Sequence, residues 1–448
     1  MGATRHYACD MRAERAGQDE DLVSLTQALT DGELTSAELV ERALTRYSQT
    51  EPALHAFAWL DPQRARDLAR RSDDRRRAGA PIGALEGIPI GIKDIFDTAG
   101  IPTENGSALF SGRVPDRSSA VVRAAEGAGA IMLGKTVTAE LAYLSPGATR
   151  NPWNTARTPG GSSMGSAAAV AAGVVPAAVG SQTNGSTIRP AAFCGVVGFK
   201  PTVGRISLEG AFEFSRTLDH VGVFTRSVRS AGLLAAILAG ESERVPRARA
   251  EVPRLAALRT SEWEHAGEPM RARFQADLDA LGLVGGPVEW PAPPAELDEA
   301  PRILRTVMLY EGARAVLPKV ARHPEVVSAL AREQLGEGAR IADRAYQDAM
   351  RERDRLIAAF ADWAAPYDAI LTPPAIGEAP APDTTGDARF CSRWSLIGAP
   401  AIAIPTGLGP LGLPLGLQLV AAPGDDARLL RAAIWIEAQL PSPGMPPG

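Results

Sequence analysis

The sequence predicts an α/β fold, with a single large domain whose central mixed β-sheet is covered by helices on both faces. Short apolar runs alternate with helical patterns along the whole chain, which is typical of a sheet between helical layers. No internal repeat or linker interrupts this alternation. The 448 residues are 45% hydrophobic, so the chain can bury a substantial core. We expect a flexible tail over 1–20, the domain over 21–440 and a second tail over 441–448.

The first third of the chain predicts helices around two buried strands. Residues 22–48 carry leucines at helical spacing, and an Asp31-Gly32 break and a Thr35-Ser36 cap divide them into two helices. A very basic helix over 61–77 is expected to present its arginines to water. The next elements are a buried strand over 85–97, a helix over 119–127 and a strand over 130–136.

The stretch over 158–202 combines two glycine- and serine-rich loops with apolar elements that can hold them rigidly. Sites that must be held to a fraction of an ångström are built on such supports. We expect Ser166 to cap the first helix of this stretch. The elements are a loop over 159–166, an Ala/Val-rich helix over 167–172, a strand ending near Gly180, a loop over 181–186 and a short helix closing at Cys194-Gly195.

The remainder of the chain continues the alternation, although residues 241–301 are the hardest to interpret. The loop over 207–224 contains Phe212 and Phe214, which could line an apolar pocket or anchor the loop. The predicted elements are a helix over 227–238, a weak strand over 255–259, helices over 300–360, a strand over 369–375, two strands within 394–420 around a Gly-Pro hairpin, and a helix over 425–440.

Composition excludes several classes of function. A net charge of −5 argues against nucleic-acid binding, which would require a basic patch. No apolar run is long enough to span a membrane, and the first twenty residues lack the core of a secretory signal.

The three cysteines, Cys9, Cys194 and Cys391, are too dispersed for a disulfide framework and fit a reducing compartment, so we expect a cytoplasmic protein. No clustered His or Cys spacing indicates a metal, and we expect neither metal nor cofactor.

One lysine stands out because lysines are scarce. Lys93 lies in a strand among Ile90, Ile92 and Ile95, where its charged head is poorly placed to reach water. Burial in such surroundings lowers the pKa of an ammonium group, as a lysine base requires. The alternative is a strand lysine that extends to solvent. The chain has four lysines, Lys93, Lys135, Lys200 and Lys319.

The glycine-serine loops resemble the signature segment of the amidase signature family, serine hydrolases that cleave amides and related acyl bonds. The resemblance rests on Gly160-Gly161-Ser162-Ser163, on the run from Gly185 to Gly195, and on the Gly198-Phe199-Lys200-Pro201-Thr202 tail. GIPIGIKD, over 87–94, is similar to the family's catalytic-lysine segment. The resemblance covers roughly residues 20 to 440 and implies the amidase signature fold, in which the variable helices around 300–360 form a wall of the substrate funnel.

The resemblance implies a Ser-cisSer-Lys triad. Ser186 would be the nucleophile and Lys93 the base, while Ser162 would pass the proton between them after a cis peptide bond from Gly161. Backbone N–H groups of Thr183, Asn184, Gly185 and Ser186 would form the oxyanion hole. Arg189 is expected to be structural, buried against loop carbonyls. Lys135-Thr136 and Glu140 resemble a family segment that we also interpret as structural.

The chain departs from the family pattern at positions that bear on substrate preference. Asn184 and Met164 stand where the family usually has glycine, and Gln182 replaces an aspartate found in many members. The side chain of Asn184 could narrow the pocket or add a hydrogen-bond donor. The residues expected to contact substrate are Met164, Ser107, Phe212 and Phe214.

Other interpretations of the serines remain open. Gly161-Ser162-Ser163-Met164-Gly165 satisfies G-x-S-x-G, which would make Ser163 the nucleophile. That motif needs a strand leading into the turn, and residues 151–158 are instead polar and bracketed by prolines. Ser162 and Ser163 could also form an ordinary capping turn.

We therefore expect a hydrolase that cleaves a C–N acyl bond of a small amide or carbamate (urethane) through an acyl- or carbamoyl-serine intermediate. The expected enzyme is a monomer or homodimer, with no nucleic-acid or membrane partner. Two alternatives remain: an amidotransferase A-type subunit that works with partner chains, and a non-catalytic binding homologue that uses the same pocket.

Overall fold

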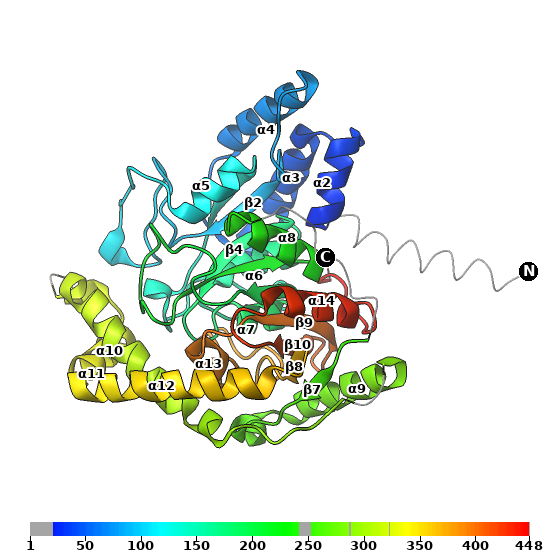
Figure 1. The fold of residues 1–448 in the computed structure, drawn as a ribbon. Coiled ribbons are helices and arrows are strands. Elements are labelled where there is room, and N and C mark those ends of the chain that lie inside the picture. Colours follow the sequence, from blue (N-terminus) through cyan, green and yellow to red (C-terminus); the bar gives the residue numbers. More distant parts are fainter. Residues whose placement is uncertain (1–20, 242–251, 286–287, 322, 448) are drawn as a thin grey trace, which may run out of the picture.

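A ten-stranded mixed sheet with helices on both faces forms the protein, which confirms the predicted α/β fold (Figure 1). The computed structural model describes residues 21–241, 252–285, 288–321 and 323–447, so the expected 1–20 tail lies outside the described residues. The strand order is β1-β3-β2-β4-β6-β5-β9-β10-β8-β7. The strands are β1 Phe57–Leu60, β2 Pro89–Lys93, β3 Ile131–Thr136, β4 Ala177–Gln182, β5 Val197–Lys200, β6 His220–Thr225, β7 Leu255–Ala257, β8 Ala369–Thr372, β9 Ala401–Leu408 and β10 Pro414–Val420.

The pairing around β2 and β4 brings three distant parts of the chain together. β2 pairs in parallel with β3 on one side and with β4 on the other, while β4 pairs antiparallel with β6. Lys93 and Gln182 are the last residues of β2 and β4, so both strands end in the same direction and at the same edge of the sheet. The loops after these strands therefore meet at that edge.

The helices pack against two separate cores, one on each face of the sheet. Along β4, Ala177 and Val179 pack into one core, whereas Ala178 packs into the other, as the two-residue period of a strand requires. The helices are α2 Leu22–Asp31, α3 Ser36–Leu54, α4 Pro62–Arg77, α5 Ala120–Gly127, α6 Met164–Ala171, α7 Ile188–Cys194, α8 Val228–Leu238, α9 Glu268–Gly285, α10 Ala300–Val320, α11 Ala329–Ala339, α12 Asp343–Ala364, α13 Arg389–Leu396 and α14 Asp426–Glu437.

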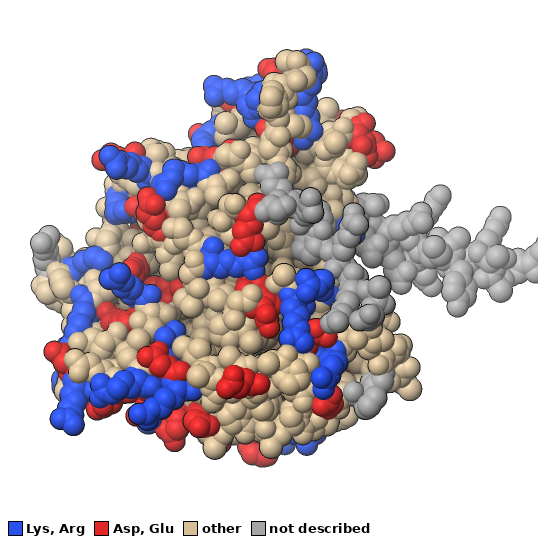
Figure 2. Space-filling model, in the orientation of Figure 1, with Lys and Arg blue, Asp and Glu red and all other residues tan. Residues whose placement is uncertain are grey.

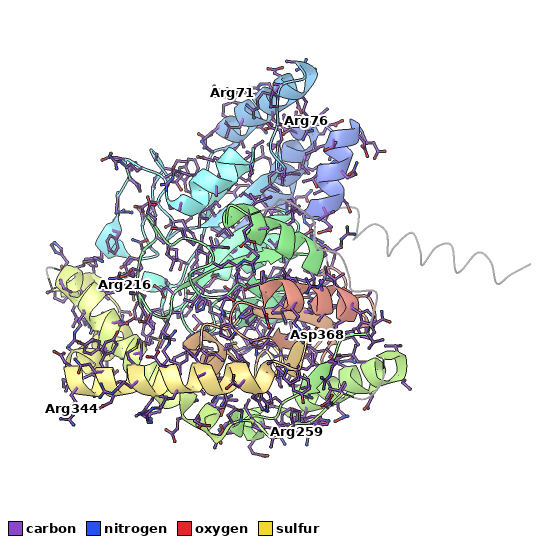
Figure 3. All side chains as sticks on the ribbon, viewed as in Figure 1. Arg71, Arg76, Arg216, Arg259, Arg344 and Asp368 are labelled. Carbon is purple, nitrogen blue, oxygen red and sulfur yellow. The ribbon has the colours of Figure 1, made fainter. Side chains whose placement is uncertain are left out.

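The expected N-terminal helices are confirmed together with their caps. Gly32 ends α2 in the left-handed conformation, with φ of 73°, and Thr35 begins α3 with a reciprocal capping box to Glu38. Only some of the arginines of α4 lie toward solvent as expected: Arg70, Arg71, Arg75 and Arg77 are exposed. Arg64 and Arg76 are half-buried and donate to the carbonyls of Met132 and Glu86. Figure 3 shows Arg71 and Arg76 on this part of the molecule.

Three predictions about local structure are wrong. The strand expected over 85–97 is only Pro89–Lys93, because Gly87, with φ of 82°, and hydrogen bonds from Leu85 and Gly87 to residues 128 and 129 turn the chain before it. Ser166 does not cap α6, which begins after Ser163; its hydroxyl instead donates to the carbonyl of Val179 at 2.9 Å. Trp394 belongs to α13, a helix that the apolar pattern did not predict.

Charges of both signs are interspersed on the face of the molecule drawn in Figure 2, without a broad region of one sign. No helix within the described ranges combines the length and apolar character needed to cross a bilayer.

Candidate active site

Lys93 is the last residue of β2 and is fully buried. Its Nζ is 2.7 Å from Ser162 Oγ and 2.8 Å from Ser181 Oγ. Burial lowers the pKa of Lys93 to about 7, and the attraction of the Asp219 carboxylate opposes this shift. A substantial neutral fraction of this amine is therefore present near pH 7, and its closest polar neighbours are two hydroxyl groups.

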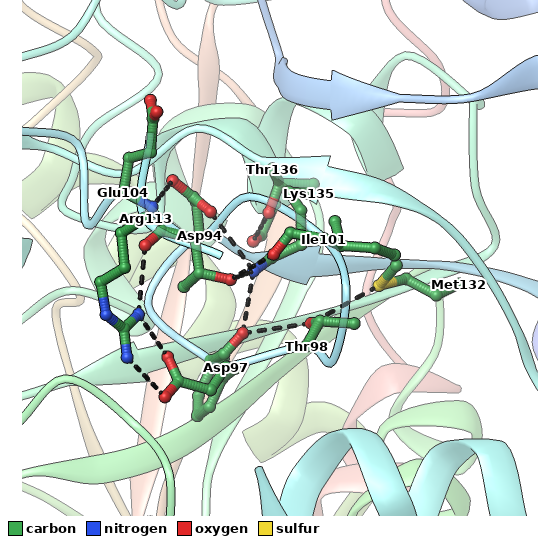
Figure 4. Close-up of polar contacts among 12 residues, drawn as sticks. Asp94, Asp97, Thr98, Ile101, Glu104, Arg113, Met132, Lys135 and Thr136 are labelled. Atoms are coloured by element: carbon green, nitrogen blue, oxygen red, sulfur yellow. Dashed lines mark hydrogen bonds and ion pairs between the residues drawn. The ribbon is translucent and has the colours of Figure 1, made fainter. Parts of the chain in front are cut away.

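Lys135, in the adjacent strand β3, is also buried but has a different set of partners (Figure 4). Its Nζ lies 3.3 Å from a carboxylate oxygen of Asp94 and donates to Thr103 Oγ1 at 2.6 Å and to the carbonyl of Phe96 at 2.8 Å. Burial lowers its pKa to about 8, and Asp94 opposes the shift. These partners all belong to the segment 94–103 after β2, so Lys135 holds that segment against β3. This contact agrees with the structural interpretation of the residue.

The loop that carries Ser162 is fixed from two sides. The peptide bond between Gly161 and Ser162 is cis, as the sequence resemblance implied. The buried guanidinium of Arg189 donates to the carbonyl of Gly161 at 2.6 Å, which is the predicted loop-holding role. The hydroxyl of Ser163 donates to the carbonyl of Ser181 at 3.1 Å and accepts from its N–H at 3.2 Å, so Ser163 bonds across to β4. Ser162 is thereby held with its hydroxyl toward Lys93.

Ser186 lies in the loop between β4 and α7 and is nearly buried, with 7% of its surface exposed. In the described part of the chain, no acceptor takes a hydrogen bond from the backbone N–H groups of Asn184, Gly185 and Ser186. Unpaired N–H groups in such a loop are available to an oxygen atom of a ligand. Thr183 is held by its hydroxyl, which donates to Asp219 Oδ1 at 2.5 Å.

Helix α13 fixes the backbone of this loop. Ser395 Oγ donates to the carbonyl of Asn184 at 2.5 Å and accepts from Gln182 Nε2 at 3.0 Å. The other end of the Gln182 side chain accepts from the N–H groups of Thr187 and Ile188 at 2.8 and 3.0 Å, at the start of α7. Gln182 therefore connects both ends of the loop to α13.

A cavity of about 240 Å³ lies over Ser186. Its wall includes Tyr143, which follows two non-glycine residues in the left-handed conformation, Leu141 with φ of 54° and Ala142 with φ of 55°. Strained backbone of this kind persists where the surrounding structure holds it, often at functional sites. The cavity is lined by Ala142, Tyr143, Leu144, Thr183, Asn184, Ser186, Arg189, Pro301, Leu304, Arg305, Met308, Gln334, Ala388 and Ser392.

None of the four side chains expected to contact substrate lines this cavity. Ser107 accepts from the N–H of Leu109 and so caps a short 3-10 turn. Met164 is fully buried, with its sulfur 3.2 Å from the N–H of Gly147. Phe212 packs edge-on against Phe110. Phe214 lies one layer behind the wall, where it stacks on Tyr143 with ring centroids 4.6 Å apart.

Several residues that meet at the site were not expected from the sequence. Ser181 and Asp219 are buried polar side chains at the ends of the paired strands β4 and β6. Ser181 accepts a hydrogen bond from Lys93 Nζ, and the carboxylate of Asp219 raises the pKa of Lys93 by electrostatic attraction. Ser392 and Ser395 lie three positions apart on α13. Residues at this spacing share one face of a helix, so the spacing could have indicated that both serines point to the same side. Arg305, Gln334 and Met308 come from α10 and α11, within the region expected to form a funnel wall.

A second hollow, of about 420 Å³, lies between the C-terminal half of α9 and Trp290 and contains none of the predicted site residues. Among the described residues, no group of three or more His, Cys, Asp or Glu side chains is arranged to hold a metal ion.

Comparisons with known proteins agree with this architecture. The family model described as Amidase matches residues 38–430. A glutamyl-tRNA(Gln) amidotransferase subunit of Chloroflexus aggregans is 34% identical, over 90% of this chain and 93% of its own. A crystal structure of an amidase has a TM-score of 0.87 at 34% identity and covers 94% of this chain and 100% of its own. The peptide amidase of Stenotrophomonas maltophilia has a TM-score of 0.82 at 29% identity, over 95% and 98% of the two chains.

The family match spans most of the chain, and the fold around the buried lysine and the two serine loops is the fold of these relatives. The chain therefore belongs to the amidase signature family, whose enzymes are C–N hydrolases and amidotransferases.

Proposed function

We propose that the protein hydrolyses the C–N acyl bond of a small, neutral amide or carbamate, with Ser186 as nucleophile, through an acyl-serine intermediate for an amide or an alkoxycarbonyl-serine intermediate for a carbamate. The observation that carries this proposal is the 2.7 Å contact between Lys93 Nζ and Ser162 Oγ; Ser186 itself lines the cavity. A neutral amine with a hydroxyl group as its close partner is poised to take a proton.

In the proposed mechanism the proton moves through two hydroxyl groups. Neutral Lys93 takes the proton of Ser162, and Ser162 takes that of Ser186 as the Ser186 oxygen attacks the substrate carbonyl. The resulting ammonium group of Lys93 then returns the proton through Ser162 to the leaving amine. Water then attacks the carbonyl carbon of the ester on Ser186 and gives a proton through Ser162 to Lys93. That proton returns through Ser162 to the Ser186 oxygen as the carboxylic acid, or for a carbamate the alkyl hydrogen carbonate, is released. The pKa of Lys93, about 7, suits both directions of transfer at neutral pH.

The developing negative charge on the carbonyl oxygen would be stabilised by the loop before α7. The backbone N–H groups of Asn184, Gly185 and Ser186 have no protein acceptor among the described residues, which supports this assignment. The N–H of Thr183 would be the fourth donor, and Asp219 positions this residue through its hydroxyl.

The charge of the cavity supports a neutral substrate. No Asp or Glu is among the described residues that line it. Of its two arginines, Arg189 donates to the carbonyl of Gly161 but has an Nε without a partner among the described residues, whereas Arg305 donates to both carboxylate oxygens of Glu337 at 2.5 and 2.7 Å. A cationic substrate group would find no carboxylate among these residues, whereas Leu304, Met308 and Tyr143 offer apolar surface to a neutral one.

A second candidate function is that of an amidotransferase component that works with partner chains. The similarity to glutamyl-tRNA(Gln) amidotransferase subunits of two bacteria favours it. If the amide donor is an amino acid such as glutamine, its ammonium group needs an acidic partner, and the part of the cavity wall that the structure describes contains none. We therefore place the hydrolysis of neutral substrates first.

The experiment that tests this choice compares three substrates with the purified protein alone: a 4-nitroanilide of a short acid, an alkyl N-(4-nitrophenyl)carbamate and glutamine. We expect release of 4-nitroaniline from the first two, no ammonia from glutamine, and no turnover of any of them by Ser186→Ala. Ammonia release from glutamine with inert anilides and carbamates would favour the second candidate. Inertness toward all three would contradict the proposal.

A further inference from the structure

Asn184 presents a fixed carboxamide at the wall of the cavity, two residues before Ser186. Its Oδ1 accepts a hydrogen bond from Ser392 Oγ at 2.7 Å. The same hydroxyl lies 3.1 Å from the carbonyl of Ala388, one helical turn earlier, and its single proton is shared unequally, with the shorter bond going to Asn184. The backbone of Asn184 is fixed as well, because its carbonyl accepts from Ser395 Oγ. Side chain and backbone are thus held by two serines on one face of α13.

The contact with Ser392 leaves the other end of the carboxamide without a partner. Among the described residues, no acceptor takes a hydrogen bond from Asn184 Nδ2, and no carboxylate lines the cavity to provide one. A carboxamide whose orientation is already fixed loses little conformational freedom when its N–H groups bind a ligand. These N–H donors are therefore available to an acceptor atom of the substrate.

The backbone N–H groups of the loop would take the oxygen of the scissile carbonyl, so Asn184 Nδ2 serves a second acceptor. We propose that Asn184 is a specificity residue that selects substrates with an additional oxygen acceptor on the acyl side, within one or two bonds of the scissile carbonyl, and that Ser392 positions it. Carbamates, 2-alkoxy amides and 2-oxo amides share this chemistry. The inference rests on the proposed hydrolysis and narrows its substrate class.

The test uses three anilides of equal length that differ at one atom: 4-nitrobutyranilide, ethyl N-(4-nitrophenyl)carbamate and 2-methoxy-4'-nitroacetanilide. The last two replace one methylene group of the first by oxygen. Differences in intrinsic reactivity between the compounds cancel, because ratios of kcat/KM are compared between the wild type and its variants. The ratio of the better oxygen compound to the butyranilide is the oxygen preference of the enzyme.

We expect Asn184→Ala to lower the oxygen preference about tenfold, because one hydrogen bond contributes roughly that factor. Asn184→Asp, which has nearly the same shape but no donor, should lower it at least as much. Ser392→Ala should lower it in the same direction by releasing the carboxamide. Met308→Leu, an apolar change elsewhere in the wall, is the matched control and should leave the oxygen preference unchanged.

The outcomes separate this inference from the proposed function. Hydrolysis of all three compounds with an oxygen preference that is equal in wild type, Asn184→Ala and Asn184→Asp would overturn the role of Asn184 and leave the hydrolase assignment intact. An oxygen preference that falls in Asn184→Ala but persists in Asn184→Asp would show an acceptor at this position, which also overturns the inference. Inertness of the wild type toward all three compounds would contradict the proposed function itself.

Discussion

Lys93 and Ser162 lie 69 positions apart in the sequence, yet the amine nitrogen of one and the hydroxyl oxygen of the other are 2.7 Å apart inside the protein. Both side chains are almost completely buried. Since water is excluded from this contact, the amine loses the hydration that would keep it charged. The hydroxyl of Ser162 is the nearest group with which it can exchange a proton.

Replacement of Lys93 by methionine should abolish turnover while the protein stays folded. Methionine fills a similar apolar volume but cannot accept a proton, so we expect kcat/KM to fall by roughly 10³-fold or more. Release of 4-nitroaniline at pH 7.5 measures the rate, and a thermal melt checks the fold. Ser163→Ala is the control, because that hydroxyl bonds only to the backbone of Ser181 and should leave a measurable rate. Normal turnover by Lys93→Met at neutral pH would refute the role of the lysine as base.

The activity should depend on the protonation of Lys93. The base acts in its neutral form, so kcat/KM should rise with pH through the pKa of Lys93, about 7, and level off above it. Asp219 favours the charged form, and Asp219→Asn removes this attraction. The pKa of Lys93 should then be lower still, so the rising limb should move to lower pH. Profiles of kcat/KM from pH 5 to 9 measure this shift. A limb that stays in place or moves to higher pH would contradict the assignment.

Gly185→Ala should damage catalysis more than stability. A Cβ at this position would lie 3.0 Å from the Cβ of Ala388, so the loop must move away from α13 by a few tenths of an ångström. We expect kcat to fall roughly 10- to 100-fold, because the N–H donors for the oxyanion are displaced. Gly127→Ala is the matched control, since its Cβ would meet nothing within 4 Å. If both variants have the activity of the wild type, the loop does not form the oxyanion hole.

Ser395→Ala should destabilise the protein. The buried hydroxyl bonds to the carbonyl of Asn184 and to Gln182 Nε2, and both groups lose a partner in the variant. We expect the free energy of unfolding to fall by about 1–3 kcal/mol, measured by urea denaturation, together with a lower kcat. Ser48→Ala, the same change on the exposed surface of α3, should stay within about 0.5 kcal/mol of the wild type. Equal stabilities of the two variants would show that α13 does not hold the loop.

The local elements were predictable wherever the sequence carries its own stop and start signals. The Asp31-Gly32 break and the Thr35-Ser36 cap each act over a few residues, and α2 and α3 end and begin there as expected. The basic helix expected over 61–77 is α4, which Asp61 caps and which begins at Pro62. Helix α13 lacked such signals: no side-chain cap begins it, and all its residues from Phe390 to Leu396 are buried. A helix that is buried all round cannot be distinguished from a buried strand by pattern alone.

The sequence by itself determined the family, the alternating fold and the three residues proposed for catalysis, because these depend on short motifs and on the burial of Lys93 among isoleucines. Only the tertiary structure decided what surrounds them. Ser181, Asp219, Ser392 and Ser395 reach the site from strands and a helix far apart in the chain, and Phe212 and Phe214 lie outside the cavity. The physical reason is that a motif fixes residue types over a few positions, whereas cavity walls and hydrogen-bond partners are set by how the sheet brings distant segments together.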